Sequence, residues 1–178
     1  MTTFNLVKLN LPPYDDLILP ALKAVRRNPE FSGLRTRFMV ILAQSKIFTL
    51  QNFGRTMAVP IDINGTTQTC AACFSSPRHA LVAWAKLLQT EGIMDDLTPV
   101  IAEENSRKVF LEAVENGLHV YLNYQAAPEE SYIFNAEETA DFYLAAPWPL
   151  EPDQVFYFDN LEAGAGGPPP NAPTGNLH

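Results

Sequence analysis

The stretch KIFTLQNFGRTMAVPIDINGTTQTCAACF, residues 46–74, decides the fold class of this 178-residue chain. It holds three strand-like runs at residues 46–50, 57–63 and 66–74. The first is rich in β-branched and aromatic side chains, and the third is the return strand after a turn. Asn52-Phe53-Gly54 is a turn signal between the first two runs. Asn64-Gly65 is a strong signal for a two-residue hairpin turn between the last two. The stretch therefore predicts a three-stranded antiparallel meander.

Helical patterns flank this meander on both sides. Residues 16–27 predict a first helix, which Asp15 or Asp16 can cap, and residues 32–43 predict a second helix with one apolar face. Downstream, the pattern alternates between the two kinds of element. We expect a helix opened by Ser75-Ser76-Pro77, a short strand near 99–101, a helix over 106–115, a strand over 118–122 and a last helix capped by Asn135.

The length and the 47% content of hydrophobic residues suit one domain that holds itself together without disulfides or metals. We predict an α/β (α+β) domain over residues 1–160, with two N-terminal helices, the antiparallel meander plus further strands, and helices packed on the sheet. The aromatic run at residues 155–158 is either an added strand or a segment folded over the core. Residues 161–178 are rich in proline and glycine, so we expect a disordered tail.

Charge is distributed unevenly along the chain. Residues 1–60 carry eight basic and three acidic residues, a formal charge of +5, whereas residues 61–178 carry four basic and 17 acidic residues, a formal charge of −13. The net charge of −8 argues against nucleic-acid binding and favours a basic protein partner, or serves solubility alone. The sequence shows no signal peptide and no apolar run that spans a membrane, so we predict a cytoplasmic protein.

Cys70-Ala-Ala-Cys73 is the one motif with obvious chemistry, since a CxxC can be a redox pair or half of a zinc site. Here the pair falls inside a predicted strand, where residues three apart point to opposite faces. His79 and His119 have no nucleophile beside them at a glycine turn, and adjacent carboxylates such as Glu137-Glu138 suit helix capping or solvation. We therefore expect structural cysteines and predict no catalytic residue, no cofactor and no metal.

Several segments resemble the SseB N-terminal domain family, the enhanced-serine-sensitivity type. They cover about residues 15–145 in the family's order: Leu22 through Pro29, Phe38, Leu42, Ser45, Ile47-Phe48-Thr49-Leu50, Cys73-Phe74-Ser75-Ser76-Pro77, Ala80 through Ala85, and Leu118 through Asn123. Tyr124-Gln125 stand where the family has Pro-Gly, so the loop after Asn123 differs. The resemblance implies an α/β fold and a binding or accessory role, and it brings no catalytic residues.

Aromatic and acidic residues alternate between Tyr121 and Trp148, a composition typical of interface hot spots. The more exposed members, which we predict to bind a partner, are Tyr124, Glu129, Glu130, Tyr132 and Trp148. We accordingly predict a non-enzymatic protein-binding protein. Its most concrete form is an immunity-type protein of bacteria, an antitoxin that neutralises a basic toxin or effector by occluding its site.

Two alternatives stay open. A structural or regulatory accessory of a bacterial secretion or stress system would self-associate, for example as a homodimer, through an edge strand at 57–63; Pro60 indicates that this strand is an edge or carries a bulge. A redox protein would instead use Cys70 and Cys73, and substitution of both by serine would abolish its activity.

Overall fold

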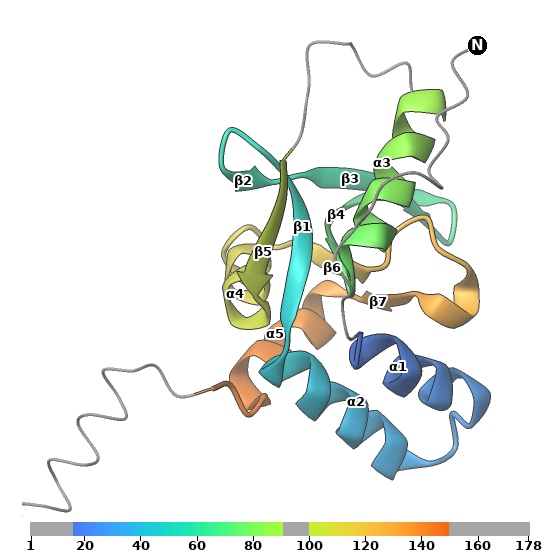
Figure 1. Ribbon diagram of the computed structural model, residues 1–178. Coiled ribbons are helices and arrows are strands. Elements are labelled where there is room, and N and C mark those ends of the chain that lie inside the picture. Colours follow the sequence, from blue (N-terminus) through green and yellow to red (C-terminus); the bar gives the residue numbers. More distant parts are fainter. Residues whose placement is uncertain (1–15, 91–99, 150–178) are drawn as a thin grey trace, which may run out of the picture. The chain divides into compact units, whose positions relative to one another are not determined.

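A computed structural model describes residues 16–90 and 100–149 of the chain. The predicted fold class is confirmed: within these residues helices pack with a mixed seven-stranded sheet (Figure 1). The helices are α1 (Ile18–Arg27), α2 (Ser32–Gln44), α3 (Pro77–Thr90), α4 (Ser106–Glu115) and α5 (Ala136–Ala145), with a 3-10 turn η2 (Pro128–Glu130). The strands are β1 (Lys46–Asn52), β2 (Arg55–Thr56), β3 (Ala58–Ile63), β4 (Thr66–Phe74), β5 (Val100–Asn105), β6 (His119–Leu122) and β7 (Tyr132–Phe134).

The turns and caps that the sequence predicted lie at the predicted residues. Asn64 and Gly65 both have positive φ, 53° and 79°, as a type I′ hairpin turn requires. The backbone N–H of Leu19 donates to Asp16 at the start of α1 (2.9 Å), so Asp16 is the residue that caps this helix. Asn135 and Glu138 form a reciprocal capping box at the start of α5.

The sheet is more closed than a simple meander. β2 pairs with β1 across the turn at residues 53–54, and β3 pairs with β4. In addition, β1 pairs directly with β4, with Phe48 opposite Phe74. On its other side β1 pairs with β5 over six residues. β4 then pairs in parallel with β6, and β6 pairs antiparallel with β7, the last strand on the sheet path.

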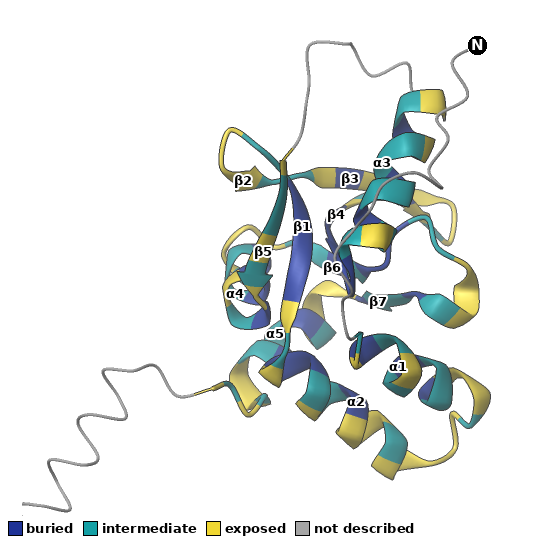
Figure 2. Ribbon diagram, viewed as in Figure 1, coloured by how far each residue is buried: buried dark blue, intermediate teal, exposed yellow. Residues whose placement is uncertain are grey.

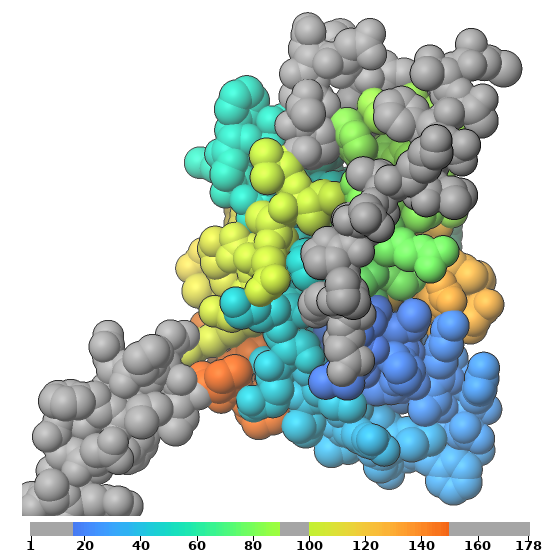
Figure 3. All heavy atoms as spheres, in the orientation of Figure 1, coloured from blue at the N-terminus to red at the C-terminus, as the bar shows by residue number. Residues whose placement is uncertain are grey.

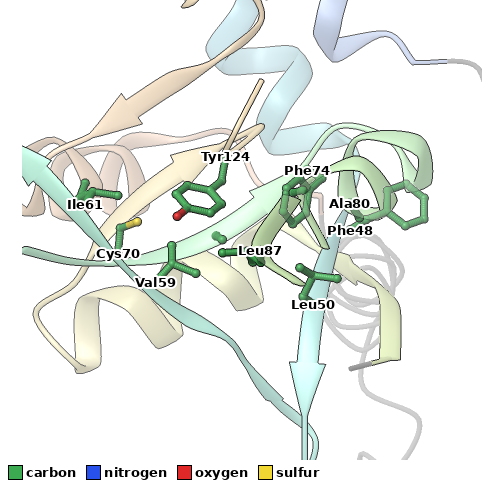
Figure 4. Packing of buried hydrophobic residues seen from close by; sticks show 11 residues of the cluster. Phe48, Leu50, Val59, Ile61, Cys70, Phe74, Ala80, Leu87 and Tyr124 are labelled. Atoms are coloured by element: carbon green, nitrogen blue, oxygen red, sulfur yellow. The ribbon is translucent and has the colours of Figure 1, made fainter. Parts of the chain in front are cut away.

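Both faces of the sheet are buried, as the colours of β1 and β4 show (Figure 2). Alternate residues of β1 and β4 point to one face, where they join Ala80, Ala83 and Leu87 of α3 in a hydrophobic cluster (Figure 4). On the opposite face a group of aromatic rings packs together from α2, α4, α5 and β7: Phe38, Phe110, Phe134 and Phe142. The helices therefore cover the sheet from both sides.

The chain divides into two units, residues 1–147 and 148–178, and of the second unit the structure describes Trp148 and Pro149. The predicted aromatic run at 155–158 and the predicted tail at 161–178 lie outside the described residues. Among the described helices, none is long and apolar enough to cross a membrane.

Candidate functional site: a groove at the β7 edge

An open groove of about 680 Å³ lies at the end of the sheet formed by β7. Its walls come from α1, β6, β7, α5 and the segment that leads from β6 into β7. The lining residues are Arg26, Tyr121, Ala126, Pro128, Glu129, Ser131, Tyr132, Ile133 and Glu138. The segment of η2 and β7, orange at the right of Figure 3, lies between α3 in green and α1 in blue.

The parallel pairing of β4 and β6 brings the C-terminal ends of these two strands together beside this groove. Both strands end on the same side, and Asn123 follows β6 with a positive φ of 56° and a fully buried side chain. Its Oδ1 accepts a hydrogen bond from the N–H of Ser75 (2.8 Å), and its Nδ2 donates to the carbonyl of Glu130 (2.8 Å). Asn123 therefore ties the ends of β4 and β6 to the turn that precedes β7.

Arg26 holds the groove from the side of α1. Its Nε and Nη2 atoms both donate to the carbonyl oxygen of Ser131, at 3.1 and 2.7 Å. The guanidinium also lies 5.1 Å from the ring centroid of Tyr132, within the range of a cation–π contact. Three contacts from one planar group restrict both side chains, so the groove is partly organised before any partner arrives.

The five predicted partner-binding residues divide between different environments. Glu129, which is exposed, and Tyr132, which is half-buried, line the groove. Glu130 is half-buried just outside the lining and pairs with Lys23 at 2.7 Å. Trp148 belongs to the second unit of the chain.

The prediction that Tyr124 is exposed is wrong, since only 7% of the residue is accessible. The backbone turns at Asn123, and the ring of Tyr124 then lies beside Val59, Cys70 and Phe74 in the hydrophobic cluster (Figure 4). Its ring also contacts that of Tyr121 edge-on, with centroids 5.3 Å apart. Tyr124 thus supports the groove from behind through Tyr121, which is one of the lining residues.

A polar chain that the sequence analysis missed runs from α3 to α1. The Oγ atom of Ser76 lies 2.8 Å from Nδ1 of His79, and Nε2 of His79 lies 3.5 Å from Glu130. The hydrogen bond from Lys23, with a further one from His79, holds the pKa of Glu130 below its ordinary value against the opposing effect of burial. The sequence drew attention to Ser76, His79 and Glu130 separately, but it held no signal that Glu130 lies beside His79, 51 residues away.

Serine, histidine and glutamate in this order also occur in hydrolases. Here the Ser76 hydroxyl accepts a bond from the backbone N–H of His79 (3.3 Å), which makes it a helix cap. Ser76 is only 7% exposed and is absent from the lining of the groove. These contacts favour a structural role for Ser76, His79 and Glu130.

Cys70 and Cys73 are free and completely buried on β4. Cys70 belongs to the hydrophobic cluster on the α3 side, and residues three apart on a strand point to opposite faces. Burial raises the pKa of Cys70 to about 12 and raises the pKa of Cys73 as well. Since the thiolate is the reactive form, this environment favours structural thiols. Within residues 16–90 and 100–149 no cluster of His, Cys, Asp or Glu could hold a metal ion.

Comparisons with family models, curated proteins and solved structures found no match to this chain.

Proposed function

We propose that this chain is a non-enzymatic protein that binds another protein through the groove at β7. The observation that carries the proposal is the groove itself, which gathers aromatic and acidic side chains from β6, η2, α5 and the edge strand β7. Aromatic anchors surrounded by polar groups are characteristic of protein interfaces. Tyr121 and Tyr132 supply the aromatic anchors here, and Glu129 and Glu138 supply the acidic groups.

The preferred partner is basic. The groove draws its two carboxylates from the part of the chain that carries a formal charge of −13. Such a field accelerates the encounter with a positively charged protein and weakens as salt is added. In its most concrete form, the proposal is an immunity-type protein of SseB-like fold that occludes the site of a basic toxin or effector.

The alternative of self-association through residues 57–63 has less support. β3 pairs with β4 alone among the described strands, so it does have a free edge. However, Pro60 lacks the N–H that a further strand would need, and both Pro60 and Asp62 are exposed along this edge. Proline and charge are two devices by which proteins protect sheet edges from pairing.

The experiment is affinity capture from the native host with the full-length tagged chain, read by mass spectrometry and followed by light scattering of the bait. A variant with Glu129→Lys and Tyr132→Ala tests the groove. Glu115→Lys serves as the charge-matched control, because Glu115 is exposed at the end of α4 and does not line the groove.

Stoichiometric capture of one basic protein by the wild type and by the Glu115→Lys control, but not by the groove variant, supports the proposal. A partner that both variants capture equally well would contradict binding through this groove. A bait that captures only itself and has the mass of a dimer would favour the self-associating alternative.

A further inference from the structure

β7 has one edge that pairs with β6 and one edge that faces the groove. Ser131, just before the strand, points its carbonyl oxygen at Arg26 of α1 and lies at the groove wall. Backbone groups of successive strand residues point alternately to the two edges. Ser131 has an extended backbone and stands two residues before Ile133, so the N–H and C=O of Ile133 fall on the same edge as the carbonyl of Ser131, which is the groove side.

The groove contacts both faces of β7. Tyr121 and Ile133 pack against the hydrophobic cluster on the α3 side of the sheet. Tyr132 lies on the other face, where its ring contacts those of Phe38 (5.7 Å) and Phe134 (4.6 Å). Because residues from both faces line one groove, the groove wraps around the outer edge of the strand. A further strand at that edge would place its alternate side chains on the same two faces.

The charges of the groove favour a cation on the occupant. Glu138 pairs with Arg35 at 3.3 Å and completes the capping box of α5. Glu129 is exposed and has no ion-pair partner among the described residues. Arg26, the positive residue of the lining, already donates to Ser131. Glu129 is therefore the carboxylate that is available to a lysine or arginine of a partner.

We propose that the groove binds an extended segment of a partner protein as an additional strand beside β7, with apolar side chains at alternate positions and a lysine or arginine that pairs with Glu129. This inference rests on the proposed protein-binding function and specifies its ligand. A second copy of the chain is a poorer occupant, since its net charge of −8 opposes association with an acidic groove. A polyproline segment is also poorer, because it lacks the N–H that would bond to the carbonyl of Ile133.

The first step of the test selects ligands with a library of random linear peptides displayed on phage, with the full-length chain as bait. We expect enriched peptides to alternate apolar and polar residues and to contain a lysine or arginine. The enriched peptides are then synthesised, and their affinities are measured by calorimetry. Failure to enrich any linear peptide would overturn the inference, while the capture experiment would still decide the proposed function independently.

The second step replaces each backbone N–H of an enriched peptide in turn by N–CH₃. A strand beside β7 presents only alternate N–H groups to the edge, where the carbonyl of Ile133 is the acceptor and that of Ser131 already accepts from Arg26. Affinity should therefore fall about 10-fold, which equals about 1.4 kcal/mol, where the peptide N–H faces the carbonyl of Ile133, and stay nearly unchanged at the positions on either side of it. Loss without this alternation would refute strand addition and leave binding by side chains in the groove, and thus the proposed function, intact.

The third step uses variants of the protein. Ile133→Pro removes the outward N–H, whereas Ile133→Ala removes most of the side chain and keeps that N–H, so the proline variant should bind an enriched peptide about 10-fold more weakly than the alanine variant. Thermal melts check that both variants are folded. If either variant is unfolded, the N-methyl peptide series of the second step still tests the inference with the wild-type protein. Glu129→Lys should weaken binding, whereas Glu115→Lys should not. Equal affinity of all four variants for the peptide would contradict both strand addition and binding in this groove.

Discussion

Replacing Asn123 by alanine removes the side chain that joins three segments of the chain. The variant leaves the buried N–H of Ser75 without the acceptor that it has at 2.8 Å. It also removes the donor to the carbonyl of Glu130, and it places alanine at a φ of 56°. All three changes act at the point where β4, β6 and the segment leading to β7 meet.

The cost follows from these contacts. A buried N–H without a partner costs about 1–3 kcal/mol, and the lost bond to Glu130 contributes about 1 kcal/mol. The left-handed backbone costs alanine roughly 1 kcal/mol, whereas asparagine adopts it more readily. The sum is about 3–5 kcal/mol, a large part of the stability of an ordinary domain.

Urea unfolding followed by circular dichroism measures this loss. With a slope of about 2–3 kcal/mol/M, the midpoint should fall by roughly 1–2.5 M. Asn123→Gly is the matched control, because it loses the same hydrogen bonds but tolerates positive φ, so it should be less destabilised than the alanine variant. A loss below about 1 kcal/mol for Asn123→Ala would refute the argument that this residue holds the groove in place.

Three further predictions concern other parts of the chain. Cys70 and Cys73 should resist iodoacetamide at pH 8 in the native protein and react once urea unfolds it. The reason is that burial raises the pKa of Cys70 to about 12 and also raises the pKa of Cys73. Rapid alkylation of the native protein, detected by mass spectrometry, would contradict this prediction. The hydrogen bond from Lys23 helps to hold the pKa of Glu130 below its ordinary value of 4.5, so the stability that ionised Glu130 adds is present above pH 4.5 and is lost as the pH falls through the lowered pKa. The difference in unfolding free energy between wild type and Glu130→Gln should therefore shrink on acidification, and a constant difference would argue against the ion pair. Gly65→Ala should lower the unfolding free energy by about 1 kcal/mol in urea titrations, because φ is 79° there, and an unchanged midpoint would exclude a strict type I′ turn.

Much of the secondary structure could be predicted from the sequence because its signals are local. Asn64-Gly65 requires no distant contact to form its turn, and the cap residues Ser76 and Asn135 satisfy N–H groups within their own helices. The turn and the starts of both helices lie at the predicted residues. The resemblance to the SseB N-terminal domain family and the protein-binding function remain predictions.

The candidate site could be predicted only in part. Glu129 and Tyr132 were recognised from composition, and the groove includes both. β7 was missed, because three residues are too few to show a strand period. Tyr124 was misplaced, because its burial depends on the positive φ of the preceding residue and on packing against β4.

The sequence by itself determined where the turns, caps and most strands lie, and it determined the acidic character of residues 61–178. Only the tertiary structure decided that β4 and β6 run in parallel and that β7 closes one edge of the sheet. The physical reason is that parallel strands need a long connection, so their pairing depends on contacts between residues far apart in the chain. Arg26 of α1 reaches Ser131 beside β7 through such a long-range contact, and both residues line the groove.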